Sequence, residues 1–594
     1  MDLAAVTSLP AMFYAQAKLL GERPFLWAKV DDVYRPHSWN AVAERITCAA
    51  HGLKAAGVKA GDRVMLVSEN RPEWLIADLA IMSIGAIAVP TYTTNTAVNH
   101  LHIINDSGAR VIIVSTPQLA RHVLAAAAES DQKVVLYVID EPEKTMKSDT
   151  PVRAWTDLLA AGANQPSPPP DLVMQKRDDV SCIIYTSGTG GLPRGVMLTH
   201  GNIIRNCMGA TEVLRPLGIG DEVFLSFLPL SHSYEHSGGQ FFPISLGAQI
   251  YYAERVETLT TNLGEARPTL MTAVPRLYES MRARILAGLK SQSSFRRNMF
   301  NLAVELGRKR YETPDAMTAW DNIRDKACDL LVRSKVKKRF GGRLKAMISG
   351  GAPLNYDVGV FFIALNVRLL QGYGQTEAGP VISANMPYKI KLKTVGPPMV
   401  GVEIKIADDG EILVRGELVM KGYWNDPDAT LATIDDEGWL HTGDIGVLDE
   451  DNYIEITDRK KDIIVNSGGD NVSPQRIQGV LGLEESVAQS MAYGDKRPYI
   501  TALIVPDADF AATWAKEHNA SPDLAALANN PEFKSAIGKA VKNANKQLSA
   551  LDKVRKFVLA TQAFTVENGM MTPTLKVRRH AILREYKAAL DALY

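Results

Sequence analysis

The chain has 594 residues, which is long enough for more than one domain. Hydrophobic residues make up 46% of it and charged residues 22%, proportions that are ordinary for a soluble globular enzyme. Its 66 Lys and Arg residues balance 66 Asp and Glu residues, so no overall positive field favours nucleic acid as a partner.

The cysteines and the apolar stretches bear on the cellular compartment. No C-x-x-C pair occurs, so we expect reduced core cysteines in a cytoplasmic protein, not a disulfide frame or a zinc site. The four cysteines are Cys48, Cys182, Cys207 and Cys328.

The first residues lack a basic stretch before an apolar run, so no signal peptide is expected. The most apolar stretch, 74–89, contains Asp78 and ends before Pro90, which predicts a buried helix running into a buried strand. An integral membrane protein is therefore not expected, while association with a membrane surface stays open.

Helical periodicity alternates with short β-branched runs as far as about Leu370. Arg63–Val67 and Ala109–Val114 are two such runs, and the alternation predicts α/β layers with parallel strands. From Val402 the segment VEIKIADDGEILVRG predicts an antiparallel hairpin with an Asp-Asp-Gly turn. The charged run 458–462 then predicts a hinge into a smaller α+β domain that ends at Tyr594.

A glycine-rich loop follows the apolar run 180–185, which we expect to be a buried strand. The loop comprises Thr186, Ser187, Gly188, Thr189, Gly190 and Gly191, followed by Pro193, Arg194 and Gly195. Glycines let backbone N–H groups converge on an anion, hydroxyls add donors, and Arg194 adds a fixed positive charge. The loop suits a nucleotide polyphosphate, although the G-x-x-x-x-G-K-[ST] motif is absent. A flexible connector is the plain alternative, but connectors do not usually follow a strand and carry Pro-Arg-Gly in order.

Two later segments have the residue types of a nucleotide site. Small residues at Gly350, Gly351 and Ala352 follow a strand-like run and allow close approach by a flat ring. The segment QGYGQTE, residues 371–377, contains Gly372, Tyr373, Gly374, Thr376 and Glu377. Tyr373 offers an aromatic face for adenine, Thr376 a hydroxyl for a phosphate oxygen, and Glu377 a carboxylate for Mg²⁺. Taken alone, this segment would also fit an ordinary turn.

These motifs, in this order, resemble those of the acyl-adenylate-forming superfamily of acyl-CoA synthetases, nonribosomal adenylation domains and luciferases. The superfamily usually has YTSGTTGxPKGV where this chain has Gly190 and Arg194, and it shares GYGxTE and GWxxTGD. The resemblance runs from Leu9 to the C-terminal tail. Within the superfamily, FLPLSHSYE at 227–235, GGRL at 341–344 and TPTLK at 572–576 are similar to long-chain fatty acyl-CoA synthetases. Arg476 stands where that family commonly has Glu.

The resemblance implies roles for further residues. Asp444 would accept hydrogen bonds from both ribose hydroxyls, Arg459 would be the second ribose contact, and Lys461 would be the hinge. Lys576 would be the catalytic lysine, and His232 would line the passage where carboxylate and thiol meet. Glu377 and Thr189 would hold Mg²⁺. Without the resemblance, Asp444 would be interpreted as a turn cap, Lys576 as a surface residue and His232 as a core histidine.

The implied architecture is a large domain, residues 1–457, of two α/β subdomains and a distorted β-barrel, with a small mobile domain at 458–594. The implied reaction uses ATP, Mg²⁺ and CoA to convert a long-chain fatty acid to acyl-AMP and then acyl-CoA. A fatty acyl-AMP ligase that serves a carrier protein stays an alternative, although the insertion typical of that class has no obvious candidate between Leu370 and Thr457. A non-catalytic acyl- or nucleotide-binding protein is a third possibility, although it would be expected to lose Glu377, Asp444 or Lys576.

One segment is strongly basic in this neutral chain. Residues 281–343 contain sixteen basic and six acidic side chains, a net charge of +10, with apolar residues such as Phe295 and Phe300 between them. A solvated helical face is the plain interpretation, and CoA phosphates are another ligand for it. We hypothesise peripheral contact with an anionic membrane, at the inner face, where the fatty acid partitions.

Overall fold

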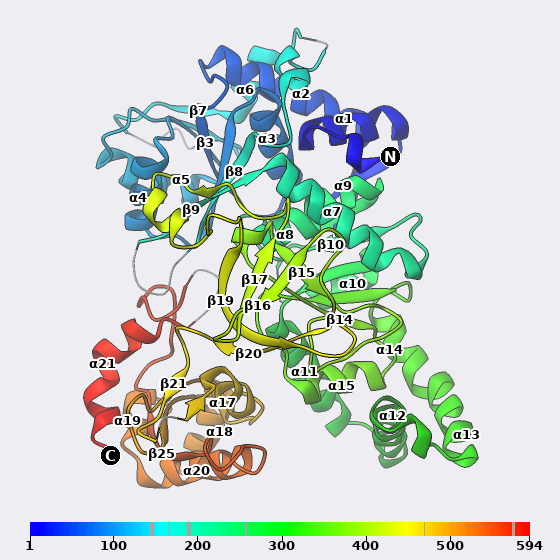
Figure 1. Ribbon diagram of the computed structural model, residues 1–594, viewed down its shortest axis with the longest axis vertical. Coiled ribbons are helices and arrows are strands. Elements are labelled where there is room, and N and C mark those ends of the chain that lie inside the picture. Colours follow the sequence, from blue (N-terminus) through cyan, green and yellow to red (C-terminus); the bar gives the residue numbers. More distant parts are fainter. Residues whose placement is uncertain (143–147, 166, 187–191, 256–257, 469, 573–576) are drawn as a thin grey trace.

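The computed structural model describes the chain except for residues 143–147, 166, 187–191, 256–257, 469 and 573–576. Two eight-stranded sheets, a four-stranded sheet and a C-terminal α/β unit are its main layers (Figure 1). Among the described helices, none combines the length and the apolarity that a bilayer crossing requires. All four cysteines are free thiols, and three of them are buried.

The first subdomain is built on a largely parallel eight-stranded sheet. Its strand order is β18-β9-β8-β4-β3-β5-β6-β7, and β3 pairs in parallel with both β4 and β5. This confirms the predicted runs at 63–67 and 109–114 as parallel strands. The strands are β3 (Arg63–Val67), β4 (Ile87–Thr91), β5 (Val111–Val114), β6 (Val135–Val138), β7 (Val152–Ala154), β8 (Val180–Thr186), β9 (Arg194–Thr199) and β18 (Gly422–Tyr423). The helices between them are α3 (Pro72–Ser83), α4 (Ala97–Ser107), α5 (Pro117–Ala128) and α6 (Trp155–Gly162).

The second eight-stranded sheet has the order β15-β14-β13-β12-β10-β11-β1-β2, with antiparallel strands at both edges. Its strands are β1 (Pro24–Val30), β2 (Val33–Ser38), β10 (Val223–Ser226), β11 (Gln249–Tyr252), β12 (Leu270–Ala273), β13 (Ala346–Ser349), β14 (Leu369–Gly374) and β15 (Val381–Ala384). Helices before and between them are α1 (Leu9–Leu20), α2 (Trp39–Ala55), α7 (His200–Leu214), α8 (Ser233–Glu235), the π-helix η4 (His236–Phe241), α9 (Phe242–Leu246) and α10 (Leu259–Ala266). The parallel strands bring the segments after β10, β13 and β14 to one edge of the sheet.

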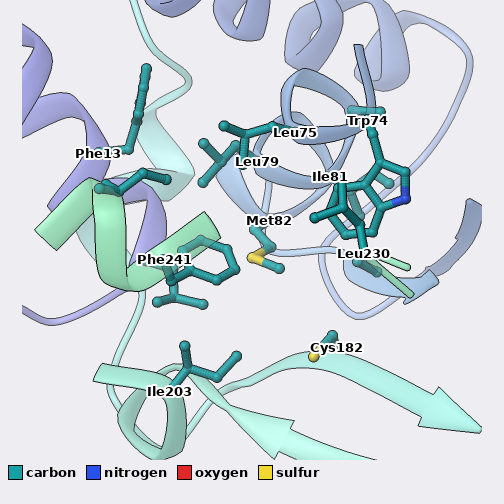
Figure 2. Packing of buried hydrophobic residues seen from close by; sticks show 14 of the residues in the cluster. Phe13, Trp74, Leu75, Leu79, Ile81, Met82, Cys182, Ile203, Leu230 and Phe241 are labelled. Carbon is teal, nitrogen blue, oxygen red and sulfur yellow. The ribbon is translucent and has the colours of Figure 1, made fainter. Parts of the chain in front are cut away.

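One apolar core joins these two sheets. Figure 2 shows Trp74 and Met82 of α3 packed with Cys182 of β8 and Phe241 of η4. The predicted apolar stretch 74–89 forms α3 and most of β4, so the expected helix running into a strand is confirmed. Both elements are almost wholly buried, which is why their sequence shows no amphipathic period.

A second core lies under a group of helices inserted between β12 and β14. These are α11 (Pro275–Lys290), α12 (Ser294–Glu312), α13 (Ala319–Cys328), the π-helix η6 (Asp329–Arg333), α14 (Ser334–Arg339) and α15 (Tyr356–Ala364). The basic segment 281–343 contains the last part of α11 and the whole of α12, α13, η6 and α14. In Figure 1, α12 and α13 lie at the lower right edge of the molecule, on the side opposite the C-terminal helix α21 (Arg579–Asp591).

The segment after β15 turns antiparallel, as the sequence predicts. The hairpin of β16 (Glu403–Ile406) and β17 (Glu411–Arg415) is confirmed, with residues 407–410 as its turn. It continues into β19 (Leu440–Leu448) and β20 (Ile454–Arg459), and the short helix α16 (Pro427–Leu431) precedes β19. The sheet order is β16-β17-β19-β20. Ile454 at the start of β20 exchanges backbone hydrogen bonds with Val395 and Gly396, and Ser383 of β15 bridges to Pro398, which agrees with the expected distorted barrel.

The C-terminal part has a three-stranded sheet with apolar side chains on both faces. Alternate residues of β24 enter separate cores, Ala502 and Ile504 on one face and Leu503 and Val505 on the other. The strands are β21 (Ile464–Val465), β22 (Asn471–Val472), β23 (Val487–Tyr493), β24 (Ile500–Pro506) and β25 (Val554–Leu559). The helices are α17 (Pro474–Leu481), α18 (Ala508–Glu517), α19 (Leu524–Ala528), α20 (Pro531–Ala544) and α21 (Arg579–Asp591). The buried residues of these two cores all lie between Ile464 and Leu590, so this part has its own hydrophobic interior, while Leu483 packs against the core beneath α11 to α15.

Candidate active site

Asp444 is held between a tyrosine and an arginine from different strands. The Tyr373 hydroxyl on β14 donates to Asp444 Oδ2 at 2.7 Å, and Arg459 Nε donates to Asp444 Oδ1 at 2.9 Å. The register of β19 and β20 places Asp444 directly opposite Arg459. Burial, and then the neighbouring carboxylate, raises the pKa of Tyr373 well above its ordinary value, so the phenol stays a donor. The pair fixes the carboxylate while each oxygen keeps a lone pair for a further donor such as a diol.

Glu377 and Arg194 both contact Tyr423. Glu377 belongs to the 3-10 turn η7 (Thr376–Ala378), and its Oε1 accepts a hydrogen bond of 2.9 Å from the Tyr423 hydroxyl. Arg194 Cζ lies 5.5 Å from the centre of the Tyr423 ring, and Arg194 Nε lies 3.3 Å from Asp426 Oδ2. Burial, and then the charge of Glu377, raises the pKa of Tyr423. The arrangement brings a carboxylate and a cation to one place, as an Mg²⁺–phosphate site requires.

The segment with His232 contacts the segment with Thr376. Ser233 Oγ and Thr376 Oγ1 are 2.9 Å apart and both residues are buried. His232 Nδ1 accepts a hydrogen bond of 3.1 Å from the backbone N–H of Tyr234, which caps the short helix α8. Since Thr376 is next to Glu377 in the chain, His232 lies close to the end of η7 that carries the carboxylate.

The small residues after β13 pack against an aromatic ring. A Cβ on Gly350 would lie 3.1 Å from Tyr234 Cζ, closer than most real contacts, so Gly350 leaves room for that ring. Gly351 has φ +81° and, like Ala352, is exposed, so the backbone here is open to a ligand.

The end of β14 also requires glycine. A Cβ on Gly374 would lie only 1.8 Å from the carbonyl oxygen of Pro380, so no other residue fits. Gly372 has looser surroundings, with its nearest contact at 3.4 Å from a Cβ. The tight turn after Gly374 sets the position of Thr376 and Glu377.

Several predicted residues lie outside these contacts. Thr186 ends β8 and pairs opposite Arg194 in β9, so it lies beside the site. Ser187, Gly188, Thr189, Gly190, Gly191 and Lys576 lie outside the described residues. Lys461 is in the turn after β20 and makes no hydrogen bond or ion pair with any described residue. Asp458 and Arg459 belong to β20, so the expected hinge run begins inside a paired strand.

The donor set fits Mg²⁺ that arrives with phosphates. Within the described part of the chain, Glu377 Oε2 accepts no hydrogen bond and remains available to a cation. The same part holds no group of three or more His, Cys, Asp and Glu side chains that could form a cage for a metal ion. Mg²⁺ is usually bound by one or two carboxylates together with substrate phosphates, and one carboxylate is what Glu377 offers.

The buried carboxyl group of Glu235, next to the segment with His232, makes hydrogen bonds to β10 and β12. Glu235 Oε1 accepts from the Ser226 hydroxyl and Oε2 from the Thr272 hydroxyl, both at 2.6 Å. Burial raises the pKa of Glu235 to about 7 in spite of these hydrogen bonds. The contacts fix α8, and hence His232 and Ser233, to the ends of β10 and β12.

The sequence did not reveal the side chains that contact and position the predicted site residues. Tyr423 comes from β18, a two-residue strand about 230 residues after its partner β9, and no local pattern marks it. Ser233 and Tyr234 lie in the segment 227–235, which the sequence did single out, so their position was available although their contacts were not.

Two protein-family models together match most of the chain. The family model for AMP-binding enzymes matches residues 13–424, and the model for the AMP-binding enzyme C-terminal domain matches residues 461–594. The chain therefore belongs to the AMP-binding enzyme family, which confirms the resemblance to the acyl-adenylate-forming superfamily.

The similar curated proteins include several long-chain-fatty-acid–CoA ligases. The chain is 32% identical to the long-chain-fatty-acid–CoA ligase FadD15 of Mycobacterium tuberculosis over 575 residues, covering 95% of this chain and 93% of that protein. It is 30% identical to long-chain-fatty-acid–CoA ligase 1 of Cavia porcellus over 597 residues, covering 95% and 83%.

Solved structures share the fold at lower identity. The adenylation domain of carboxylic acid reductase from Segniliparus rugosus, in complex with AMP and a co-purified carboxylic acid, matches with a TM-score of 0.74 and 21% identity. That match covers 99% of this chain and 94% of the other. The anthranilate CoA ligase AuaEII in complex with anthranoyl-AMP matches with a TM-score of 0.72 and 19% identity over 100% of both chains. The predicted fold class, a large α/β domain followed by a small C-terminal domain, is confirmed.

Proposed function

We propose that this chain is an AMP-forming long-chain fatty acid–CoA ligase. The observation that carries the proposal is two sets of contacts, from Arg459 through Asp444 to Tyr373 and from Glu377 through Tyr423 to Arg194, which the short segment from Tyr373 to Glu377 connects along the chain. It joins a diol-binding carboxylate to a cation-binding carboxylate in a chain whose curated relatives, matched over nearly its whole length, are named for long-chain fatty acids.

In the first half-reaction, a fatty carboxylate oxygen attacks the α-phosphorus of ATP and pyrophosphate leaves. Asp444 and Arg459 would orient the ribose, Tyr373 with the backbone at 350–352 would flank adenine, and Thr376 would contact a phosphate oxygen. Mg²⁺ on Glu377 and Thr189 would neutralise phosphate charge. Positioning and charge stabilisation account for such a step without an enzyme nucleophile.

The anion nest and the catalytic lysine complete the adenylation site. Thr186, Ser187, Gly188, Thr189, Gly190 and Gly191 would present backbone N–H groups and hydroxyls to the polyphosphate, and Arg194 would add a cation. Lys576 would bridge the attacking carboxylate and the α-phosphate, where charge develops in the transition state.

In the second half-reaction, the CoA thiolate attacks the acyl carbonyl carbon and AMP leaves. Residues 1–457 and 458–594 would act as two domains that rotate about 458–462, with Lys461 as the hinge, so that Lys576 leaves the site. His232 would line the passage in which the thiol meets the adenylate.

A panel of carboxylates with ATP and CoA tests the proposal, with AMP and thioester as the readouts. Long-chain acids should give equimolar AMP and acyl-CoA, while short or aromatic acids should give little of either. Adenylate without thioester at saturating CoA would favour an acyl-AMP ligase for a carrier protein. Nucleotide binding without AMP release would favour a non-catalytic protein on this fold.

We also propose that the enzyme works in the cytoplasm and contacts the inner face of an anionic membrane through residues 281–343. The support is the charge of this segment and the chemistry of a substrate that partitions into lipid. Salt-sensitive cosedimentation with anionic vesicles tests this contact.

A further inference from the structure

Two neighbouring helices expose large apolar side chains to solvent. Phe295 on α12 is 70% exposed, and on α13 Trp320 is 64% and Ile323 is 59% exposed. Leu330, in the adjoining η6, is 75% exposed. We call these four residues the apolar face. Exposed side chains of this size are common singly, but a group on adjacent elements usually marks an interaction surface.

The spacing places Phe295 on one stripe of α12, and Trp320 and Ile323 on one stripe of α13. Phe295, Met299 and Leu302 are four and seven residues apart, so they share one side of α12. Together with Arg324 of α13 they line a shallow groove on the protein surface. Trp320, Ile323 and Arg324 are three and four residues apart, so they share the side of α13 that reaches this groove. Figure 1 shows both helices at the edge of the molecule, where a planar partner can reach them.

Unpaired cations surround the apolar face. Arg296, Arg297, Arg324 and Lys326 stand within three residues of it in sequence, and none forms an ion pair with a described residue. The neighbouring acids are largely neutralised within the protein, because Asp321 pairs with Lys309 at 2.8 Å and Asp325 pairs with Arg310 and Arg333, each at 2.5 Å. Glu305 lines the groove as an opposing charge. The net local field is therefore positive.

We infer that the apolar face inserts into the interface of an anionic bilayer, with Arg296, Arg297, Arg324 and Lys326 at the level of the lipid phosphates. Exposed aromatic and aliphatic side chains ringed by cations are the pattern of interfacial membrane binding. The inference deepens the proposed function, since a fatty acid dissolved in the bilayer would be taken up where the enzyme docks. Each cation removed should lower vesicle affinity about fivefold at moderate salt.

Trp320 supplies a direct test. The structure describes all eight tryptophans, and Trp320 is the one whose side chain is exposed. Trp320 should therefore be the tryptophan whose fluorescence brominated lipid quenches. Full-length protein without ATP is mixed with phosphatidylcholine vesicles containing brominated phosphatidylglycerol. We expect quenching of tryptophan emission in the wild type and its loss in Trp320→Phe, which should still sediment with the vesicles. Sedimentation without quenching of Trp320 would overturn the inference.

Two variant sets separate charge from insertion. Replacing the four cations by Gln should lower binding to anionic vesicles by roughly six hundredfold. Phe295→Ser with Ile323→Ser should lower the binding that persists at high salt. Leu19→Ser on α1, which removes a side chain 74% exposed, is the matched control and should change nothing. Equal binding by all variants, or a dimer in sedimentation velocity that Phe295→Ser dissolves, would overturn the inference. Because these measurements need no turnover, they succeed or fail independently of the ligase assignment.

Discussion

Arg333 offers the sharpest test of how the basic helices are anchored. Its guanidinium is 2% exposed and all five N–H groups are used. They donate to the carbonyls of Ala364, Asp325 and Ala303 and to the carboxylates of Asp325 and Asp329, at 2.5–3.1 Å. Arg333 thereby joins α12, α13 and α15.

Arg333→Met removes these bonds while keeping an apolar chain of similar length. Breaking a buried ion pair by removing one partner costs about 3–5 kcal/mol. Arg310 still pairs with Asp325 through a second bond of 2.5 Å, which favours the lower end, about 3 kcal/mol. Since about 1.4 kcal/mol is a factor of ten, local opening of these helices should become roughly a hundredfold more frequent.

Hydrogen exchange by mass spectrometry measures this opening without assuming one global transition, which a multidomain chain need not show. Protection should fall in peptides covering 294–339 and stay unchanged in β23 to β25. Arg339→Met, at an exposed residue that pairs with no described acidic side chain, is the control and should shift exchange less than about threefold. A change below threefold for Arg333→Met, or a loss spread over the C-terminal sheet, would refute the reasoning.

Three further predictions concern the site. Lys576→Ala should slow adenylate formation by roughly 10²–10³ and largely spare thioester formation from supplied acyl-AMP, and equal loss in both half-reactions would remove Lys576 from its role. Lys461→Pro should keep substantial adenylation, because the Lys461 N–H donates no hydrogen bond to a described residue that proline would remove. It should lose most thioester formation, because proline locks the φ angle that the domain rotation has to change. Lys461→Ala should keep both activities. Burial raises the pKa of Glu235 to about 7, so its neutral form stabilises the fold fully below the unfolded pKa of 4.5, and this stabilisation is lost as pH rises through 7. The Tm of Glu235→Gln should therefore rise relative to that of the wild type as pH increases from about 5 to 8.5. A Tm difference that stays constant over this range would contradict the prediction.

The sequence predicted the elements that carry strong local signals. The parallel strands at 63–67 and 111–114 and the hairpin of β16 and β17 follow from β-branched runs and an Asp-Asp-Gly turn, which act over a few residues. Asp444 and Arg459 were both singled out, and the register of β19 and β20 places them opposite each other.

What the sequence did not predict depends on contacts between distant segments. Tyr423 reaches Glu377 only because β18 adds to the edge of a sheet whose neighbouring strand ends at residue 199. The apolar face likewise needed the structure, because Phe300 and Phe295 look alike in the sequence, yet one is 7% exposed and the other 70%.

The most direct test of the central claim follows the oxygen atoms of the substrate. A long-chain fatty acid with both carboxylate oxygens labelled with ¹⁸O is incubated with the enzyme, ATP, Mg²⁺ and CoA. Mass spectrometry then measures the ¹⁸O content of AMP and acyl-CoA. If the carboxylate attacks the α-phosphorus and the thiolate then displaces AMP, each AMP carries one labelled oxygen and each acyl-CoA keeps the other. Unlabelled AMP, or labelled acyl-AMP that accumulates without acyl-CoA at saturating CoA, would contradict the account.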